Sequence, residues 1–71
     1  MMSEVIVRVG GMSCEGCSTR LQKVLNELQG VAQAHVTLAS GQAVIQYDEQ
    51  QITEHDVREC IEESGFDVLN A

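Results

Sequence analysis

Residues 5–30 read VIVRVGGMSCEGCSTRLQKVLNELQG, and this stretch changes its hydrophobic period once. Over residues 5–9, valine occupies every second position, which is typical of a β-strand with one buried face. Two glycines then interrupt the alternation and begin a loop that carries Cys14 and Cys17. Apolar residues recur after the loop with the spacing of a helix that packs on a sheet: Leu21, Val24, Leu25 and Leu28. The stretch therefore predicts a strand, a cysteine-bearing loop and a helix closed by Gly30 as its C′ residue.

The remainder of the chain contains further segments of both kinds. They are predicted as strands at 34–38 and 43–47 joined by a Ser40-Gly41 turn, a helix from Thr53 to Gly65, and a short strand at 66–69. The predicted order β-α-β-β-α-β is that of a ferredoxin-like α+β sandwich, in which a four-stranded antiparallel sheet carries two helices on one face. We expect residues 1–71 to form a single domain.

The second helix has its own start signal and one unusual residue. Thr53 is expected to cap it, because Asp56 follows three residues later in a capping-box arrangement. Its apolar stripe consists of Val57, Cys60, Ile61 and Ser64. Cys60 is therefore most simply a small buried hydrophobic residue. The alternative is a third thiolate that reaches a metal after loop movement or in a dimer.

The composition restricts the class of function. The 71 residues carry a net charge of −7 and only one Tyr and one Phe, so nucleic acids and anionic membranes are not expected partners. Residues 1–47 sum to zero, whereas residues 48–71 hold eight acidic residues against Arg58 alone, which gives the whole −7. Arg20 and Lys23 form a small basic island on the first helix. A chain this short leaves little room for a deep cleft, so the chemistry is expected at the surface.

The N-terminal sequence and the number of cysteines indicate the cellular compartment. No stretch resembles a signal peptide, and none is long enough to span a bilayer. We therefore expect a cytoplasmic protein without direct membrane insertion, in which thiols stay reduced. Three cysteines are an odd number, which favours metal or redox chemistry over a disulfide framework.

The pair Cys14 and Cys17 is the candidate metal site. Cys17 falls in the first turn of the predicted helix, where free backbone N–H groups and the positive end of the dipole favour a thiolate. The two-residue spacing brings both sulfurs to one side of the loop. Structural Zn²⁺ prefers four ligands, whereas Cu(I) and Hg(II) accept two thiolates. A two-coordinate ion remains open to attack by a partner's thiolate, so the site is suited to passing its metal on.

A lone Cys-x-x-Cys motif is compatible with other chemistries. Thiol–disulfide exchange of the thioredoxin kind is one alternative, although the chain has no Trp and no Pro and its element order differs from that fold. A Zn²⁺ site that recruits Cys60 or His55 is another. These two residues are five apart on one helix, so they point in different directions and joint ligation is awkward.

Several motifs together resemble the heavy-metal-associated domain family. They are Gly-Met-Ser-Cys-Glu-Gly-Cys at 11–17, Leu-Gln-Gly-Val at 28–31, the Ser-Gly hairpin, and Glu-Ser-Gly-Phe-Asp at 63–67. The resemblance implies that Cys14 and Cys17 are the metal ligands. It implies that Met12 packs beneath the loop, and that Phe66 packs near the site, where ATPase-type domains usually carry Phe. Members selective for Zn²⁺ tend to have Asp where this chain has Ser13, so the resemblance favours a monovalent ion.

The resemblance also implies a function. Members include copper chaperones and the N-terminal domains of copper-transporting P-type ATPases, which are not enzymes. It favours Cu(I) as the cargo, transferred to such an ATPase or a similar metal-binding domain by a protein that is monomeric without metal and can form a metal-bridged dimer. Arg20 and Lys23 are expected to meet an acidic surface of the partner and to set its orientation. The alternative is a domain that delivers Hg(II) to a mercuric reductase core.

Three other candidate ligands are interpreted as surface residues. Glu15 lies between the cysteines and is expected to face solvent and the helix N-terminus. His35 sits on a predicted strand, and His55 lies in the first turn of the second helix. Neither histidine has neighbours that would complete a metal site.

Overall fold

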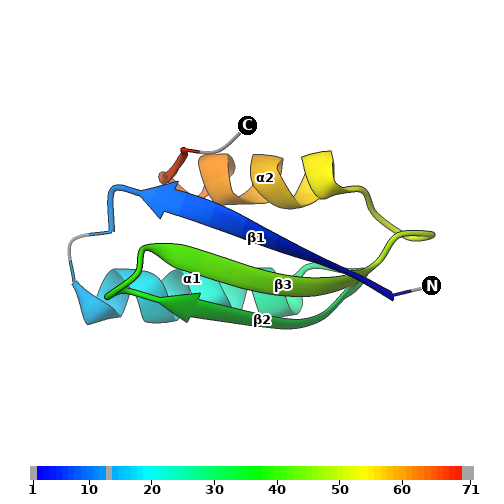
Figure 1. The fold of residues 1–71 in the computed structure, drawn as a ribbon, viewed down its shortest axis with the longest axis horizontal. Helices are drawn as coiled ribbons and strands as arrows, with labels where there is room; N and C mark the ends of the chain where they lie inside the picture. The colour runs from blue at the N-terminus through cyan, green and yellow to red at the C-terminus, as the bar shows by residue number, and fades with distance from the viewer. Residues whose placement is uncertain (1, 13, 70–71) are drawn as a thin grey trace.

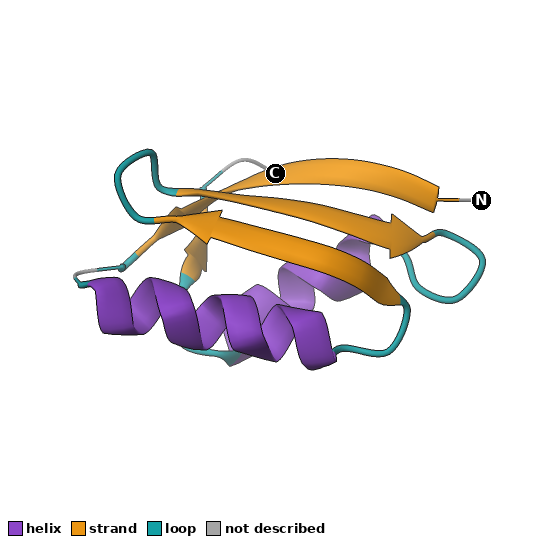
Figure 2. Cartoon of the chain, turned by 90° about the horizontal axis from the view of Figure 1, so that it is seen from below, coloured by secondary structure: helices purple, strands orange, loops and turns teal. Residues whose placement is uncertain are grey.

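The computed structural model describes residues 2–12 and 14–69 and has the predicted element order (Figure 1). The elements are β1 (Met2–Gly10), α1 (Glu15–Glu27), β2 (Val31–Thr37), β3 (Gln42–Asp48), α2 (Glu54–Glu63) and β4 (Asp67–Val68). The sheet is antiparallel with strand order β2-β3-β1-β4, and both helices lie against the same face of it (Figure 2). The ferredoxin-like α+β fold is therefore confirmed.

The core forms where the alternating face of the sheet meets one stripe of each helix. Val5, Val7 and Val9 of β1 are buried, while the residues between them are exposed. The most completely buried side chains are Leu21, Leu25, Ile45, Ile61, Val7 and Val57. The core also contains both aromatic residues of the chain, Tyr47 and Phe66. Because the core is small, the position of each helix also depends on polar contacts.

Two amides on α1 attach this helix to the free edge of β2. The Asn26 side chain accepts a hydrogen bond from the Ala34 amide at 2.9 Å and donates one to the Ala34 carbonyl at 3.1 Å. Gln22 accepts a third bond from the Val36 amide at 2.9 Å. These bonds satisfy backbone groups that an edge strand otherwise leaves open. They also fix the direction of α1, and with it the position of the cysteine loop.

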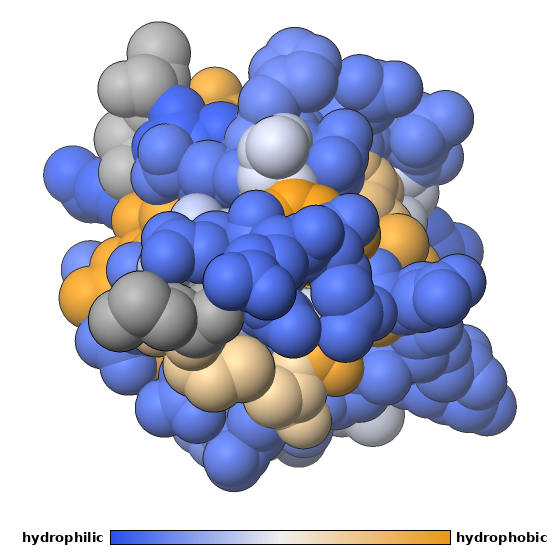
Figure 3. All heavy atoms as spheres, turned by 90° about the vertical axis from the view of Figure 1, so that its right-hand side faces the viewer, coloured by the Kyte–Doolittle hydropathy of each residue, from blue (hydrophilic) through white to orange (hydrophobic). Residues whose placement is uncertain are grey.

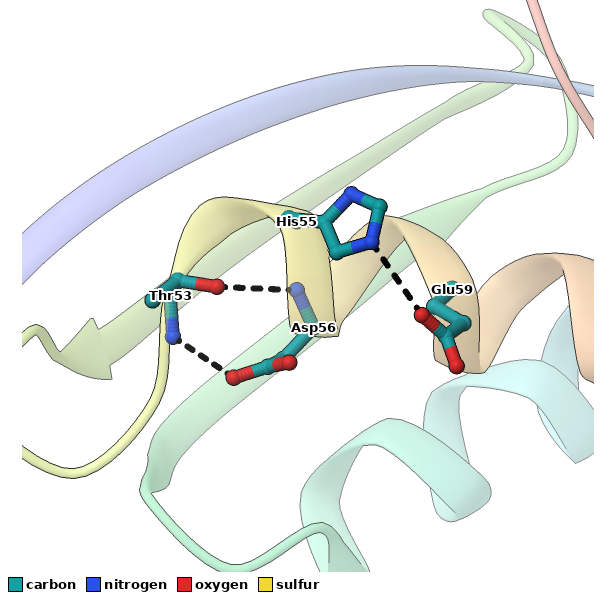
Figure 4. Close-up of polar contacts among 4 residues, drawn as sticks. All are labelled: Thr53, His55, Asp56 and Glu59. Carbon is teal, nitrogen blue, oxygen red and sulfur yellow. Dashed lines mark hydrogen bonds and ion pairs between the residues drawn. The ribbon is translucent and has the colours of Figure 1, made fainter.

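Helix α2 begins and ends at well-formed caps. The predicted capping box is confirmed: Thr53 Oγ1 accepts from the Asp56 amide at 3.1 Å, and the Asp56 carboxylate accepts from the Thr53 amide at 3.0 Å (Figure 4). At the other end, the Phe66 amide bonds to the Ile61 carbonyl across Gly65, which has φ of +96°. This is the arrangement of a Schellman motif, with Phe66 and Ile61 both buried.

Several predicted boundaries were wrong. β1 starts at Met2 and β2 at Val31, both earlier than predicted, because pairing with β3 continues beyond the alternating apolar residues. β2 ends at Thr37, so the turn to β3 is longer than the predicted Ser-Gly pair. At the C-terminal end, Leu69 follows β4 and is 63% exposed.

The end of α1 was also placed too late in the chain. α1 ends at Glu27 with Leu28 as its C-cap, and Gly30 lies in the following turn, which is closed by the Val31 amide bonding to the Leu28 carbonyl at 3.1 Å. α2 ends at Glu63 with Ser64 as its C-cap, and Gly65 closes it as the C′ residue, as predicted.

Gly30 and Gly65 make a matched pair for testing these turns. Both have positive φ, but a Cβ on Gly30 would lie 2.8 Å from Ile52 Cγ2, whereas a Cβ on Gly65 would meet nothing within 4 Å. We expect Gly65→Ala to lower the free energy of unfolding by about 1 kcal/mol, through backbone strain alone. Gly30→Ala should lower it by roughly 1–3 kcal/mol more, because of the added clash. Urea unfolding measures both values, and equal losses would contradict the assigned clash.

Candidate metal site

Cys14 and Cys17 lie close together, after the end of β1 and at the start of α1. Cys14 is the N-cap of α1 with extended backbone angles, and its carbonyl accepts bonds from the amides of Cys17 at 3.1 Å and Ser18 at 3.3 Å. The two Sγ atoms are 3.4 Å apart, within hydrogen-bonding distance for sulfur. The expectation that both sulfurs come to one side of the loop is confirmed. Cys14 is exposed and Cys17 is partly buried, so the pair is reachable from solvent on the Cys14 side.

The loop is held from both of its flanks. Before it, Val9 and Gly10 of β1 pair with Val68 and Asp67 of β4. Within it, Met12 is partly buried and packs against the core, which agrees with the role that the family resemblance implied. The predicted contribution of Ser13 lies outside the described residues.

The first turn of α1 is held by a buried hydroxyl. Ser18 is 7% exposed, and its Oγ donates a hydrogen bond to the Glu15 carbonyl at 2.9 Å. The Cys14 side chain makes no capping bond to the backbone, so its sulfur is not engaged with the helix amides. Both sulfurs lie at the N-terminus of α1, the positive end of the helix dipole.

The other candidate ligands lie elsewhere. His35 and Glu15 are exposed, as expected, and His55 forms an ion-pair contact with Glu59 at 3.2 Å on the surface of α2 (Figure 4). Cys60 packs against the core as a partly buried residue. Over residues 2–12 and 14–69, no group of three or more His, Cys, Asp and Glu residues gathers to hold a metal.

Both residues of the basic island on α1 are exposed, and one of them also makes a contact within the molecule. Lys23 is exposed, but the Arg20 guanidinium donates a hydrogen bond to the Ser64 carbonyl at 2.6 Å and lies 5.8 Å from the centre of the Phe66 ring. Arg20 thus has a contact within the molecule while it remains exposed, as Lys23 does. Sequence spacing could not find this contact, because Arg20 and Ser64 are 44 residues apart.

The opposite end of the molecule has a different character. Viewed from the side away from the cysteine loop, the surface is mainly hydrophilic with isolated apolar residues (Figure 3). The connector between β3 and α2 lies there, and it consists of residues 49–53, directly after Asp48 at the end of β3. Hydrogen bonds from the Gln50 amide, and secondarily from the Gln51 side chain, lower the pKa of the Asp48 carboxyl. This acidic connector and the cysteine pair therefore lie at opposite ends of the molecule (Figure 1).

The structure places two thiols between the first strand and the first turn of the first helix of a ferredoxin-like fold. This is the arrangement expected from the family resemblance. The model of the heavy-metal-associated domain matches residues 6–67. The chain belongs to this family. The residues that match the family model include most of the sheet, the loop and both cysteines.

Curated relatives and solved structures agree with this assignment. The chain is 38% identical over 68 residues to the copper chaperone CopZ of Staphylococcus aureus, covering 96% of this chain and 100% of that protein. A CopZ metallochaperone structure has a TM-score of 0.88 at 37% identity and covers 94% and 100% of the two chains. The water-soluble region of the P-type ATPase CopA from Bacillus subtilis has a TM-score of 0.90 at 32% identity, covering 97% of this chain and 46% of that one.

The described part of the chain contains two helices, α1 and α2. Neither is long and apolar enough to cross a bilayer.

The reactivity of Cys60 provides a test of its surroundings. Burial raises the pKa of the Cys60 thiol above its usual value of 9.0, and the nearby Glu63 carboxylate raises it further. In a Cys14→Ser/Cys17→Ser background at pH 8, iodoacetamide should therefore modify Cys60 more slowly in the folded chain than in urea, because less thiolate is present. Glu63→Gln should speed the reaction, whereas Glu62→Gln should leave it unchanged. Equal rates in folded and unfolded protein would refute this assignment.

Proposed function

We propose that this heavy-metal-associated domain binds Cu(I) through the thiolates of Cys14 and Cys17 and transfers it by ligand exchange to a partner domain. The observation that carries the proposal is the 3.4 Å separation of the two sulfurs at the N-terminus of α1. Soft thiolates select soft ions, and two of them satisfy Cu(I). The absence of a further cluster of ligands in the described part of the chain also favours a low-coordinate ion over a closed tetrahedral Zn²⁺ site.

The proposed transfer requires no enzyme-like group. An incoming thiolate of the partner forms a Cu–S bond, and a Cu–S bond to Cys14 or Cys17 breaks. The released thiolate then takes a proton from solvent, and copper remains Cu(I) throughout. Cys14 is the more exposed ligand, so its side of the loop is the proposed side of attack.

The partner is proposed from the relatives. Their names describe copper chaperones and parts of copper-transporting P-type ATPases, which supports a metal-binding domain of such an ATPase as donor or acceptor. We further propose that residues 1–71 act as one domain in the cytoplasm, where thiols stay reduced, as a carrier and not an enzyme. On this proposal the protein is a monomer without metal, and a metal-bridged dimer forms only through shared thiolates.

Anaerobic metal titration tests the proposal. The reduced protein is titrated with Cu(I), Hg(II) and Zn(II) in the presence of competing chelators, beside Cys14→Ser, Cys17→Ser and Cys60→Ser. We expect one Cu(I) per chain, lost in the first two variants and unchanged in the third, because only the paired sulfurs can share the ion. Tightest binding of Zn(II), or loss of Cu(I) binding in Cys60→Ser, would overturn the proposal. Hg(II) binding without Cu(I) binding would favour the mercury-delivery alternative.

Charge reversal at Lys23 tests whether its positive charge steers the partner domain during Cu(I) transfer. Lys23→Glu should slow Cu(I) transfer to the isolated N-terminal domain of a copper ATPase by about tenfold at low salt, because the exposed charge steers an acidic partner surface. Arg8→Glu makes the same change of charge on β1 and should alter transfer little. The rates are followed by stopped-flow competition over a salt titration. Equal slowing by both variants would contradict a local steering role.

A further inference from the structure

Arg20 joins two parts of the chain that flank the cysteine loop. It lies three residues after Cys17 on α1, and its side chain crosses to the C-cap of α2, where it donates to the Ser64 carbonyl at 2.6 Å. The same guanidinium lies 5.8 Å from the centre of the Phe66 ring. Because side chains lean toward the N-terminus of their helix, Arg20 lies over the turn that carries Cys17.

The strand register brings Phe66 to the other flank of the loop. β4 pairs antiparallel with β1, with Asp67 opposite Gly10. Phe66 directly precedes Asp67, and Gly11 directly follows Gly10, so the ring lies level with the start of the loop. Phe66 is 6% exposed and belongs to the core cluster against which Met12 and Cys17 pack. Phe66 therefore lies beside the start of the loop, and Ser64 and Gly65 connect it to the end of α2.

The chemistry of the contact suits an arginine. The C-terminus of a helix carries partial negative charge and carbonyls without helical partners, which a guanidinium neutralises. The flat guanidinium can donate to Ser64 while it also contacts the face of Phe66. Glu62 and Glu63 at the end of α2 are exposed, and the Arg20 guanidinium donates to the Ser64 carbonyl.

We propose that Arg20 is a positioning residue that latches residues 64–66 against the flank of the cysteine loop and thereby limits the rate of metal exchange. This inference rests on the proposed function. With the latch closed, an incoming ligand reaches the ion from the Cys14 side only. With the latch open, residues 64–66 move away from the loop and a second approach becomes available. Equilibrium affinity changes less than the exchange rate, because neither sulfur is moved.

The test is a double-mutant cycle on the full chain. Arg20→Met keeps the helix and the length of the side chain but removes the charge and the donors, and Phe66→Leu removes the ring but keeps an apolar core residue. The rate of Cu(I) transfer to excess bathocuproine disulfonate is measured for the wild type, both single variants and the double variant. Cu(I) affinity and urea unfolding are measured in parallel. Arg8→Met serves as the control, because it removes an exposed charge of the same sign from β1 and leaves the Arg20 contact in place.

Arg20→Met should speed transfer by about three- to fivefold, the factor that an exposed cation–π contact represents. It should add little in the Phe66→Leu background, because the two residues act as one unit. Arg20→Lys should give an intermediate rate. Additive effects of the two substitutions, an unchanged rate in Arg20→Met, or equal acceleration by Arg8→Met would overturn the latch.

A measurement without metal separates this inference from the proposed function. In the apo protein, Arg20→Met should lower the ¹⁵N heteronuclear NOE of the Ser64, Gly65 and Phe66 amides, while the amides of β3 stay unchanged. Unaltered values at residues 64–66 would refute the latch even if Cu(I) binds as proposed. Loss of Cu(I) binding in the wild type together with the expected change in NOE would instead overturn the proposed function and leave the latch in place.

Discussion

The hydrogen bonds that the Cys14 carbonyl accepts from the amides of Cys17 and Ser18 determine the whole site. They begin α1 directly at the first cysteine, so both sulfurs are set by helix geometry and not by a free loop. The far side of α1 is fixed in turn by Asn26 and Gln22, which bind the edge of β2. A pair of thiols only 3.4 Å apart follows from these two sets of bonds.

The distribution of charge has a structural reason as well as a solvation role. Eight acidic residues beyond residue 47 give the chain its net charge of −7, and most of them are exposed on α2 and the turns beside it. Arg20 crosses from α1 to the C-terminal end of α2, where it meets a carbonyl and an aromatic ring. Arg20 therefore connects residues 1–47, which have no net charge, to the acidic residues 48–71. The same contact gives a means of controlling ligand exchange.

The sequence was sufficient to predict what depends on local periodicity. The alternation of valines in β1, the stripe of Leu21 and Leu25, and the Thr53–Asp56 capping box each reflect a rule that acts within a few residues. The cysteine pair could be placed for the same reason. The engagement of Arg20 depends on a tertiary contact with Ser64, which no local pattern encodes. The four-residue spacing of Gln22 and Asn26 was a usable signal, because it puts two amides on one face of α1 beside the apolar stripe.

The central claim is that two sulfurs, and no other atoms of the chain, hold the metal. X-ray absorption at the copper edge of the Cu(I)-loaded monomer measures this directly, because it counts the sulfur, nitrogen and oxygen neighbours of the ion. The account predicts two sulfur neighbours, no nitrogen or oxygen neighbour, and the same spectrum for Cys60→Ser. Three or more sulfurs in the monomer, or a nitrogen neighbour from a histidine, would contradict it.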